Sequence, residues 1–343
     1  MSQPLRIGVA GIGMIARRMH LPNLAALPEA EVTALWSRRV ESLEAGAEAL
    51  GSARPTRYQK FEAFLAHPGL DAVLITAPDH LHEAMALAAL AAGKHVYLEK
   101  PPAITEDGNR RVLEAAELSD RVAVIGLQNR YSALYTRVAE LLAAGAIGRV
   151  RMLWCKEYRI PFLPKPDDWI LTKAGTGGSL LVKCIHFFDL FNWYAGAIAT
   201  RVMATGGTGV VPGQETLDHA WVLVDYANGV RACLGMALFA PRGERVDVEL
   251  IGEAGRITLS VQDQTLTVET ASGTDSRKAA APGEHFHAGS RLALEDFVRC
   301  ARDGGVPRAS LRIGVAAALL ALAAERSVEE NRAVDLVHPV APA

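Results

Sequence analysis

Hydrophobic residues in the first 125 positions follow two alternating patterns. Short runs of consecutive apolar residues, such as Leu5 to Ala10 and Ala72 to Thr76, have the length of strands buried on both faces. Each run is followed by a longer stretch with helical character. Such alternation predicts a parallel sheet covered by helices on both faces. The pattern predicts strands at 5–10, 31–36, 55–58, 72–76, 96–98 and 122–125, and helices at 14–27, 40–50, from 61, at 82–92 and at 105–119.

The pattern changes in the second part of the chain. Two predicted strands, Trp221 to Tyr226 and Val230 to Leu238, flank a hairpin signal at Asn228-Gly229. Hairpin-joined strands indicate an α+β domain with an open, largely antiparallel sheet, over residues 127–343. Its C-terminal helices are long enough to pack back on the first domain, residues 1–126. Further expected elements are strands at 148–158, 244–251, 255–261 and 265–269, a loop at 161–166, and helices at 133–144, 179–194, 290–302 and 311–324.

The composition is that of an ordinary soluble globular protein. Of 343 residues 50% are apolar and 22% are charged, and the net charge of −2 excludes a strongly basic nucleic-acid-binding protein. The longest apolar stretch, Ile313 to Ala324, is shorter than the roughly 20 residues that span a membrane. Four scattered cysteines, together with an N-terminus that lacks the design of a signal peptide, favour a cytoplasmic protein.

The histidines do not show the spacing of a metal centre. His80 and His82 lie two residues apart, as do His285 and His287, without the ligand pattern of a zinc site. We therefore expect loop histidines and no bound metal.

A glycine-rich turn follows the first predicted strand and opens the first predicted helix. Residues 11–16 read Gly-Ile-Gly-Met-Ile-Ala, which is the G-x-G-x-x-A form of the dinucleotide fingerprint. The first glycine permits a tight turn, the second lets the backbone approach a pyrophosphate, and the alanine permits close packing of helix on strand. Phosphates bind at such a helix N-terminus. The alternative is a glycine turn in a ligand-free domain. The expected dinucleotide-binding residues are Gly11, Ile12, Gly13, Met14 and Ala16.

The end of the second predicted strand bears on which dinucleotide is bound. An NAD site usually carries an acidic residue here to hold the ribose 2′-hydroxyl. This chain instead has Ser37, Arg38 and Arg39. A hydroxyl followed by two guanidinium groups suits a 2′-phosphate. The sequence therefore favours NADP over NAD. The alternative is that the two arginines stand at the start of a helix without a binding role.

A lysine, Lys100, stands at the carboxyl end of the predicted strand at 96–98. Ligands bind outside this end of the strands in an open parallel sheet. A lysine facing a nicotinamide ring can orient a carbinol or carbonyl oxygen or give it a proton. By position alone, a solvated lysine at a strand end is the alternative.

Three segments together resemble a known family. They are GIGMIA near the N-terminus, TAPDHLHEAMALAALAAGKHVYLEKP, and GGSLLVKCIHFFDLFNW. In this order they are similar to the Gfo/Idh/MocA family, named for glucose–fructose oxidoreductase, inositol dehydrogenase and rhizopine catabolism. The resemblance implies a Rossmann domain followed by an α/β domain with an open sheet, often used for dimerisation or tetramerisation. It also implies NAD(P)-dependent oxidation or reduction of sugars and cyclitols.

The resemblance assigns roles in the first domain. It implies that Glu99, Lys100 and Pro101 are the EKP motif of the family, with Lys100 at the catalytic position. The segment with Thr76, Ala77, Pro78 and His82 is then the one that passes the ribose and nicotinamide of the cofactor. Asp79 stands where an asparagine is usual, which bears on one cofactor hydrogen bond.

A predicted helix at 179–194 carries a second candidate group. On this helix Val182, Lys183, His186 and Asp189 share one face, since they are three or four residues apart. A histidine beside a cofactor is a reasonable general base near neutral pH, whereas a core histidine is the alternative. The resemblance implies that His186 is the catalytic histidine. The acid usual four residues earlier is replaced by Val182, with Lys183 as the nearest polar residue.

Two further places carry candidate substrate or cofactor contacts. Gln128 and Arg130 follow the sixth predicted strand, at the sheet edge where side chains can meet sugar hydroxyls. A solvated connector between domains is the alternative there. Trp169, after the proline-rich loop, can stack on a sugar or nicotinamide ring, or pack beneath the loop. The expected substrate contacts are thus Lys100, Gln128, Arg130, His186 and Asp189.

The most specific reading is an NAD(P)-dependent oxidoreductase that transfers a hydride to or from a sugar, sugar derivative or cyclitol. A non-catalytic dinucleotide-sensing regulator of the same fold is the alternative, for which Val182 is the one hint. A third reading is carbon–halogen or glycosidic chemistry through transient oxidation. We expect a small polyhydroxylated substrate and a homodimer or homotetramer formed through the open sheet face near Trp221, Val222 and Val224.

Overall fold

The computed structural model describes residues 3–51, 54–278, 284–337 and 340, with the backbone alone for 284–288. These residues divide into two compact units. Unit 1 comprises Met1–Ala103, Asp107–Tyr131 and His287–Gly314, and unit 2 comprises Ile104–Glu106, Ser132–Phe286 and Val315–Ala343. Each unit has its own sheet.

Unit 1 contains a six-stranded sheet in the order β3-β2-β1-β4-β5-β6, in which every pair of neighbours is parallel. The central strand β4 is apolar throughout and all four of its residues are buried, as expected for a sheet covered on both faces. The prediction of a Rossmann-type parallel sheet is confirmed. The strands are β1 (Leu5–Ala10), β2 (Ala30–Trp36), β3 (Thr56–Tyr58), β4 (Ala72–Ile75), β5 (His95–Leu98) and β6 (Ala123–Ile125).

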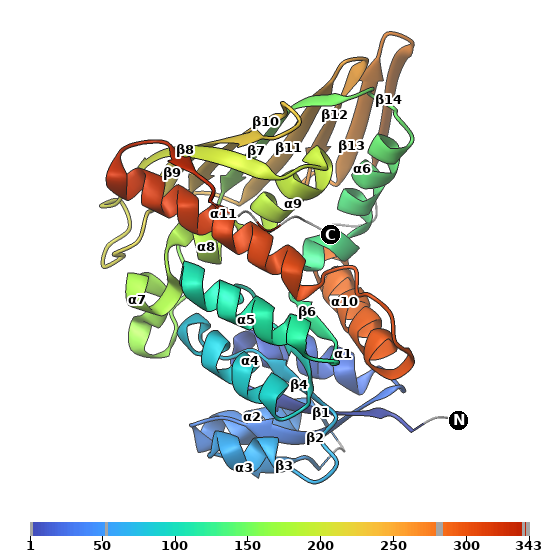
Figure 1. The fold of residues 1–343 in the computed structure, drawn as a ribbon, viewed down its shortest axis with the longest axis vertical. Helices are drawn as coiled ribbons and strands as arrows, with labels where there is room; N and C mark the ends of the chain where they lie inside the picture. The colour runs from blue at the N-terminus through green and yellow to red at the C-terminus, as the bar shows by residue number, and fades with distance from the viewer. Residues whose placement is uncertain (1–2, 52–53, 279–283, 338–339, 341–343) are drawn as a thin grey trace. The chain divides into compact units, whose positions relative to one another are not determined.

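Helices alternate with these strands (Figure 1). The helix after β1 contains a π-helical turn, Ala16–His20, before α1 (Leu21–Ala25). A later segment completes the unit, because Ser310 pairs with Val124 of β6 and the Ile125 amide donates to the Ala309 carbonyl at 3.0 Å. The other helices are α2 (Val40–Ala49), α3 (Phe61–Leu65), α4 (His82–Ala91), α5 (Glu106–Leu118) and α10 (Glu284–Asp303), of which His287–Asp303 lies in unit 1.

Unit 2 contains a nine-stranded sheet in the order β14-β13-β12-β11-β7-β10-β9-β8-β15. Only β10 and β7 pair in parallel among these neighbours, so the expected open and largely antiparallel sheet is confirmed. Sequence patterns did not predict β8, β14 and β15. The strands are β7 (Val150–Tyr158), β8 (Ala199–Gly207), β9 (His219–Tyr226), β10 (Arg231–Ala237), β11 (Arg245–Gly252), β12 (Gly255–Ser260), β13 (Thr265–Thr270), β14 (Gly273–Lys278) and β15 (Val334–Asp335).

Helices cover one face of this sheet (Figure 1). They include α6 (Ala133–Ala143), α9 (Ile185–Ala195) and α11 (Leu311–Glu330), and the Ser327 hydroxyl of α11 accepts a hydrogen bond from the Ala204 amide of β8 at 2.8 Å. Two short helices, α7 (Lys173–Thr176) and α8 (Ser179–Val182), precede α9.

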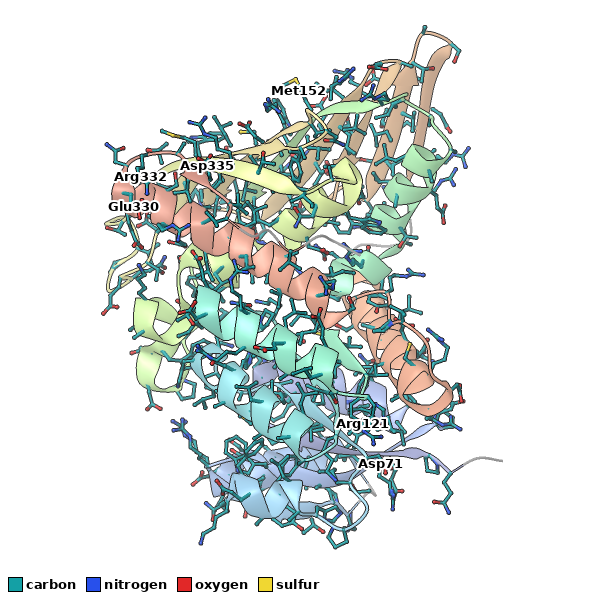
Figure 2. The ribbon with its side chains drawn as sticks, in the orientation of Figure 1. Asp71, Arg121, Met152, Glu330, Arg332 and Asp335 are labelled. Atoms are coloured by element: carbon teal, nitrogen blue, oxygen red, sulfur yellow. The ribbon has the colours of Figure 1, made fainter. Side chains whose placement is uncertain are left out.

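The other face of the sheet is open and carries several large exposed apolar side chains. Trp221 of β9 is 58% exposed, and Met152 of β7 projects from the same sheet (Figure 2). The placement of Val222 and Val224 near this face was wrong, because both are fully buried and strand residues alternate between faces. The large exposed apolar side chains of the sheet are Met152, Trp154, Tyr158, Met203, Trp221, Leu223 and Ile251.

Candidate active site

The glycine turn after β1 has the geometry of a dinucleotide cradle. Gly11 has φ +94°, and a Cβ there would lie 2.5 Å from the Ala77 amide nitrogen, so only glycine fits. The Thr76 hydroxyl donates to the Gly11 carbonyl and fixes the two segments together. A Cβ on Gly13, in contrast, would meet nothing within 4 Å. The open space is therefore beside Gly13, where the fingerprint needs the backbone to approach a pyrophosphate.

The other fingerprint residues, Ile12, Met14 and Ala16, hold the first helix against the sheet. Ala16 is fully buried and Ile12 is 3% exposed, which keeps the helix close to the sheet, while Met14 is half-buried. The helix begins at Met14, directly after the open space. Its positive end suits a phosphate. These residues fit a nicotinamide dinucleotide, which would supply the hydride acceptor or donor.

The end of β2 brings a hydroxyl and two cations together. Ser37 is buried, its Oγ accepts from the Arg39 amide at 3.2 Å, and its own amide donates to the Tyr58 carbonyl at 3.1 Å. The Arg38 carbonyl accepts from Gln59 Nε2 at 3.1 Å. Both arginine side chains are exposed. The backbone is thus fixed while the guanidinium groups stay accessible to an anion.

The turn after β5 holds Glu99 and Lys100. Glu99 Oε1 lies 2.8 Å from Nε2 of His20, which is fully buried, and Glu99 Oε2 accepts from the Lys100 amide at 3.3 Å. An ionised carboxylate only accepts, so Nε2 of His20 carries the donating proton. The Lys100–Pro101 peptide bond is cis, and Lys100 is half-buried. Sequence reasoning missed His20, although a histidine within the first helix of the fingerprint was visible.

His82 supports the cofactor segment from inside. Its ring is buried, with Nδ1 2.7 Å from the Pro101 carbonyl oxygen and Nε2 2.9 Å from the Ala77 carbonyl oxygen. Burial lowers the pKa of His82, although both hydrogen bonds oppose the shift. The imidazole therefore links Ala77 to the turn that carries Lys100. Ala77 and Asp79 are buried, and Thr76 and Pro78 are half-buried.

The expected single helix at 179–194 was wrong, because the chain forms α8 and α9 with a turn at Lys183 and Cys184 between them. The turn alters which residues share a face. Lys183 and His186 are half-buried, whereas Val182 and Asp189 are buried. Lys183 Nζ lies 5.1 Å from the ring centroid of Phe162, within cation–π distance, which ties this turn to the proline-rich loop.

Trp169 lies in an irregular segment, Pro166–Leu171, and is half-buried. Two consecutive residues before it, Asp167 and Asp168, have φ of 61° and 46°, a left-handed conformation that non-glycine residues adopt at a cost. The Trp169 carbonyl accepts from the Thr172 hydroxyl at 3.1 Å. A side-chain hydrogen bond therefore holds the backbone at Trp169.

Gln128 and Arg130 are both buried, in a 3₁₀ turn, Gln128–Tyr131, directly after β6. The Arg130 carbonyl accepts from Arg308 Nη1 at 3.2 Å. Tyr131 donates to Asp296 Oδ2 at 2.8 Å. The turn is thus fixed within unit 1, which also holds Gly11 to Ala16, Ser37 to Arg39, and Lys100. Trp169, Lys183, His186 and Asp189 belong to unit 2.

Within the part of the chain that the structure describes, no three His, Cys, Asp or Glu side chains form a group that could hold a metal ion. The side chains of His285 and His287 lie outside the described residues. Among the described residues, no helix combines the length and the apolar character needed to cross a membrane.

Comparison with known proteins agrees with this geometry. Residues 5–127 match a family model described as an oxidoreductase family with an NAD-binding Rossmann fold, and residues 135–258 match the GFO/IDH/MocA C-terminal domain. Myo-inositol 2-dehydrogenase of Thermotoga maritima is 28% identical, over 97% of this chain and 98% of that protein.

Two further relatives span nearly the whole chain. A dTDP-3,4-didehydro-2,6-dideoxy-alpha-D-glucose 3-reductase of Streptomyces violaceoruber is 33% identical, over 92% of each chain. The structure of a levoglucosan dehydrogenase in complex with NADH superposes with a TM-score of 0.87, covering 98% of this chain and 100% of that one at 21% identity, which shows the shared fold. The chain belongs to the Gfo/Idh/MocA family of oxidoreductases, with an NAD-binding Rossmann domain.

Proposed function

We propose that the protein transfers a hydride between a nicotinamide cofactor and a carbinol or carbonyl carbon of a sugar, sugar derivative or cyclitol. The observation that carries this proposal is the fixed placement of Lys100 directly after β5, by the Glu99 carboxylate and the His20 ring. The relatives named for myo-inositol and for a dTDP-linked deoxysugar support a polyhydroxylated substrate.

The roles of the side chains follow from their chemistry. When a secondary alcohol is oxidised, its carbon loses a hydride to the cofactor and its oxygen loses a proton. Lys100 would hold the oxygen through its ammonium group, and His186 would take the proton. In the reduction direction the same two groups return the proton to the oxygen. Lys183 adds positive charge near His186, and Gln128, Arg130 and Asp189 are the proposed contacts to the other hydroxyls.

NADP is the proposed cofactor, ahead of NAD. Ser37, Arg38 and Arg39 offer a hydroxyl and two exposed guanidinium groups at the end of β2, where a 2′-phosphate would lie. The family model is described as NAD-binding, so the choice between the two dinucleotides depends on these three residues.

A second candidate is a dinucleotide-sensing regulator without turnover. One observation favours it: Val182, buried at the end of α8, occupies the place of the expected acid. The half-buried Lys100 and His186 favour catalysis instead.

We also propose that the protein is cytoplasmic and assembles from two or more copies of the chain. The four cysteines are free thiols, as is usual for a protein of the reducing cytoplasm. The apolar outer face of the nine-stranded sheet is the surface through which two copies would pair.

The test is a turnover assay with a panel of cyclitols and sugars, under NAD and NADP and in both directions. Lys100→Met and His186→Ala should each lower kcat by roughly 10²-fold or more, the usual size of a general acid–base contribution. Lys183→Ala should cause a smaller loss. Lys60→Met, which changes an exposed lysine, is the control and should leave kcat unchanged. Near-parental turnover in His186→Ala would remove that residue from the mechanism.

A further inference from the structure

A carboxyl group is buried beneath the turn that starts α8. Glu325 of α11 is 6% exposed, and its Oε1 accepts a hydrogen bond from the Leu180 amide at 2.7 Å. Gly178 lies against it with φ +132°, and a Cβ at this position would overlap the carboxyl group. The backbone at residue 178 is therefore packed directly on Glu325.

The same turn is held from its other sides by neutral groups. The Ser179 hydroxyl donates to Thr216 Oγ1 at 2.8 Å, and the Gly178 amide donates to Thr176 Oγ1 at 3.2 Å. Glu325 is the carboxyl member of this set. It stands on a helix that is about 145 positions away in sequence, so its contact with Leu180 sets the position of α8 relative to α11.

A carboxyl group is an unfavourable choice for this place if packing alone were required. Burial raises the pKa of Glu325 to about 7, against the opposing effects of the Leu180 hydrogen bond and of Lys173. The titratable groups around it are Lys173 on α7, Glu329 one turn further along α11, and Cys184 after α8. What the carboxyl group supplies is an acceptor oxygen for a buried amide, which would otherwise lack one at a substantial cost.

We propose that Glu325 is a positioning residue for the reaction: its oxygen fixes the Gly178 turn and the start of α8, and through them the turn that contains Lys183 and the helix α9 that carries His186. The inference rests on the proposed function, because it matters for turnover only if His186 takes part. Glu325 itself is not proposed to touch substrate or cofactor.

Three variants separate the acceptor oxygen from the charge. Glu325→Gln keeps an acceptor for Leu180 and should retain kcat within about twofold. Glu325→Ala removes the acceptor and should lower kcat at least about tenfold, while the dissociation constant of the dinucleotide stays unchanged. Glu329→Gln alters an exposed carboxylate one turn away on the same helix and is the matched control, with parental kcat expected.

Amide hydrogen exchange reports on the position directly. In Glu325→Ala the amides of Leu180 to Phe187 should exchange faster than in the parent, and in Glu325→Gln they should not. A residue that only stabilised the fold would lower the melting temperature without this local pattern and without changing kcat well below melting.

The pH dependence of stability gives an independent readout. Because the pKa of Glu325 is raised above its unfolded value, the parent gains stability from this group at low pH and loses it as pH rises through about 7. The melting temperature of Glu325→Gln relative to the parent should therefore rise between pH 5 and pH 8. Glu329→Gln should show no such trend.

The outcomes are distinguishable. If the parent turns over none of the panel, the proposed function fails, and faster exchange at Leu180 to Phe187 in Glu325→Ala decides whether Glu325 holds the turn. If the parent is active and folded Glu325→Ala keeps parental kcat and exchange, the inference is overturned. If Glu325→Ala does not fold, Glu325→Asp, which withdraws the oxygen by about 1.5 Å, takes its place with the same expected losses.

Discussion

The Glu99 carboxylate accepts from two groups at once, one side chain and one amide. His20 reaches it from the π-helical turn, 79 positions earlier in the chain, and the Lys100 amide reaches it from the next residue. The Tyr97 ring lies edge-on to His20, with 5.5 Å between the ring centroids. A fully buried histidine therefore holds the carboxylate that accepts from the Lys100 amide.

We expect His20→Leu to destabilise the fold by about 1–3 kcal/mol, because Glu99 loses the buried donor that satisfies it. Turnover should fall as well, since the turn beneath Lys100 loses its anchor. Urea unfolding at a constant m-value measures the first effect, and a steady-state assay the second. Arg18→Ala, an exposed change in the same helical turn, should alter stability by less than about 0.5 kcal/mol. Unchanged stability in His20→Leu would show that Glu99 does not depend on this donor.

Cofactor choice is also decided by single residues. If Ser37, Arg38 and Arg39 bind a 2′-phosphate, NADP(H) should bind at least about tenfold more tightly than NAD(H), which is roughly 1.4 kcal/mol. Arg38→Ala should remove most of this difference. Binding titrations followed by calorimetry measure both constants, with Arg137→Ala on α6 as the exposed control. Equal affinities in the parent would refute the assignment.

Candidate site residues that belong to a local pattern could be named from the sequence, and their roles stay predictions. The glycine turn, Lys100 after β5 and the arginines after β2 are local patterns with local meanings. His20 and Glu325 were not predictable, because each acts on a segment distant in sequence. A lone histidine or glutamate in a helix carries no sign of the partner that folding gives it.

Helices and strands likewise divide into those that the sequence predicted and those that it missed. In unit 1 the strand β4 was predicted because it is fully buried and consists of a continuous apolar run. β14 was not, because Gly273–Lys278 is exposed throughout and contains no apolar alternation. The break between α8 and α9 was also missed, since residues 179–194 are apolar on almost every side and the period gives no sign of a turn.

The loop between β8 and β9 depends on one carboxylate. Asp218 accepts from the Val210 amide at 2.7 Å, from the Val211 amide at 3.0 Å and from His219 Nδ1 at 2.7 Å. Burial alone would raise the pKa of Asp218, but the hydrogen bonds from Val211, His219 and Val210 lower it.

Asp218→Asn should therefore be less stable than the parent at pH 7. A lowered pKa means that the contribution is present above the unfolded pKa of about 4 and is lost as pH falls through the folded value, so the gap should close below pH 4. Thermal unfolding between pH 3 and pH 7 measures this. Asp225→Asn, an exposed change on β9, should leave stability nearly unchanged at both ends of the range. A gap that is constant with pH would contradict the assignment.

At the scale of the whole molecule, the open face of the nine-stranded sheet carries most of the large exposed apolar side chains of the described part of unit 2. The register places Trp154 beside Cys233, Cys233 beside Leu223, and Leu223 beside Met203, which makes an apolar row across four strands. The Trp221 ring lies against Gly235, where a Cβ would come within 2.6 Å of it. An exposed apolar surface of this kind is typical of an interface.

We expect the protein to be a dimer or a dimer of dimers, and Trp221→Glu to shift it toward the monomer, because each symmetric contact would bury two added charges. Light scattering at micromolar concentration measures the mass. Leu118→Glu changes a residue that is 82% exposed on α5 and should leave the assembly intact. A monomeric parent would refute this use of the face.

The return of His287–Gly314 to unit 1 has a consequence for the order in which the chain can fold during synthesis. The Phe297 ring packs edge-on against Tyr97 with 5.7 Å between centroids, and Ser310 pairs with β6. Unit 1 therefore lacks these contacts until residues 132–286, and then 287–314, have been synthesised. Residues 1–131 therefore expose apolar surface during the synthesis of the nine-stranded sheet of unit 2. A fragment ending at residue 131 should accordingly bind chaperones and be digested readily, although it contains every strand of its sheet.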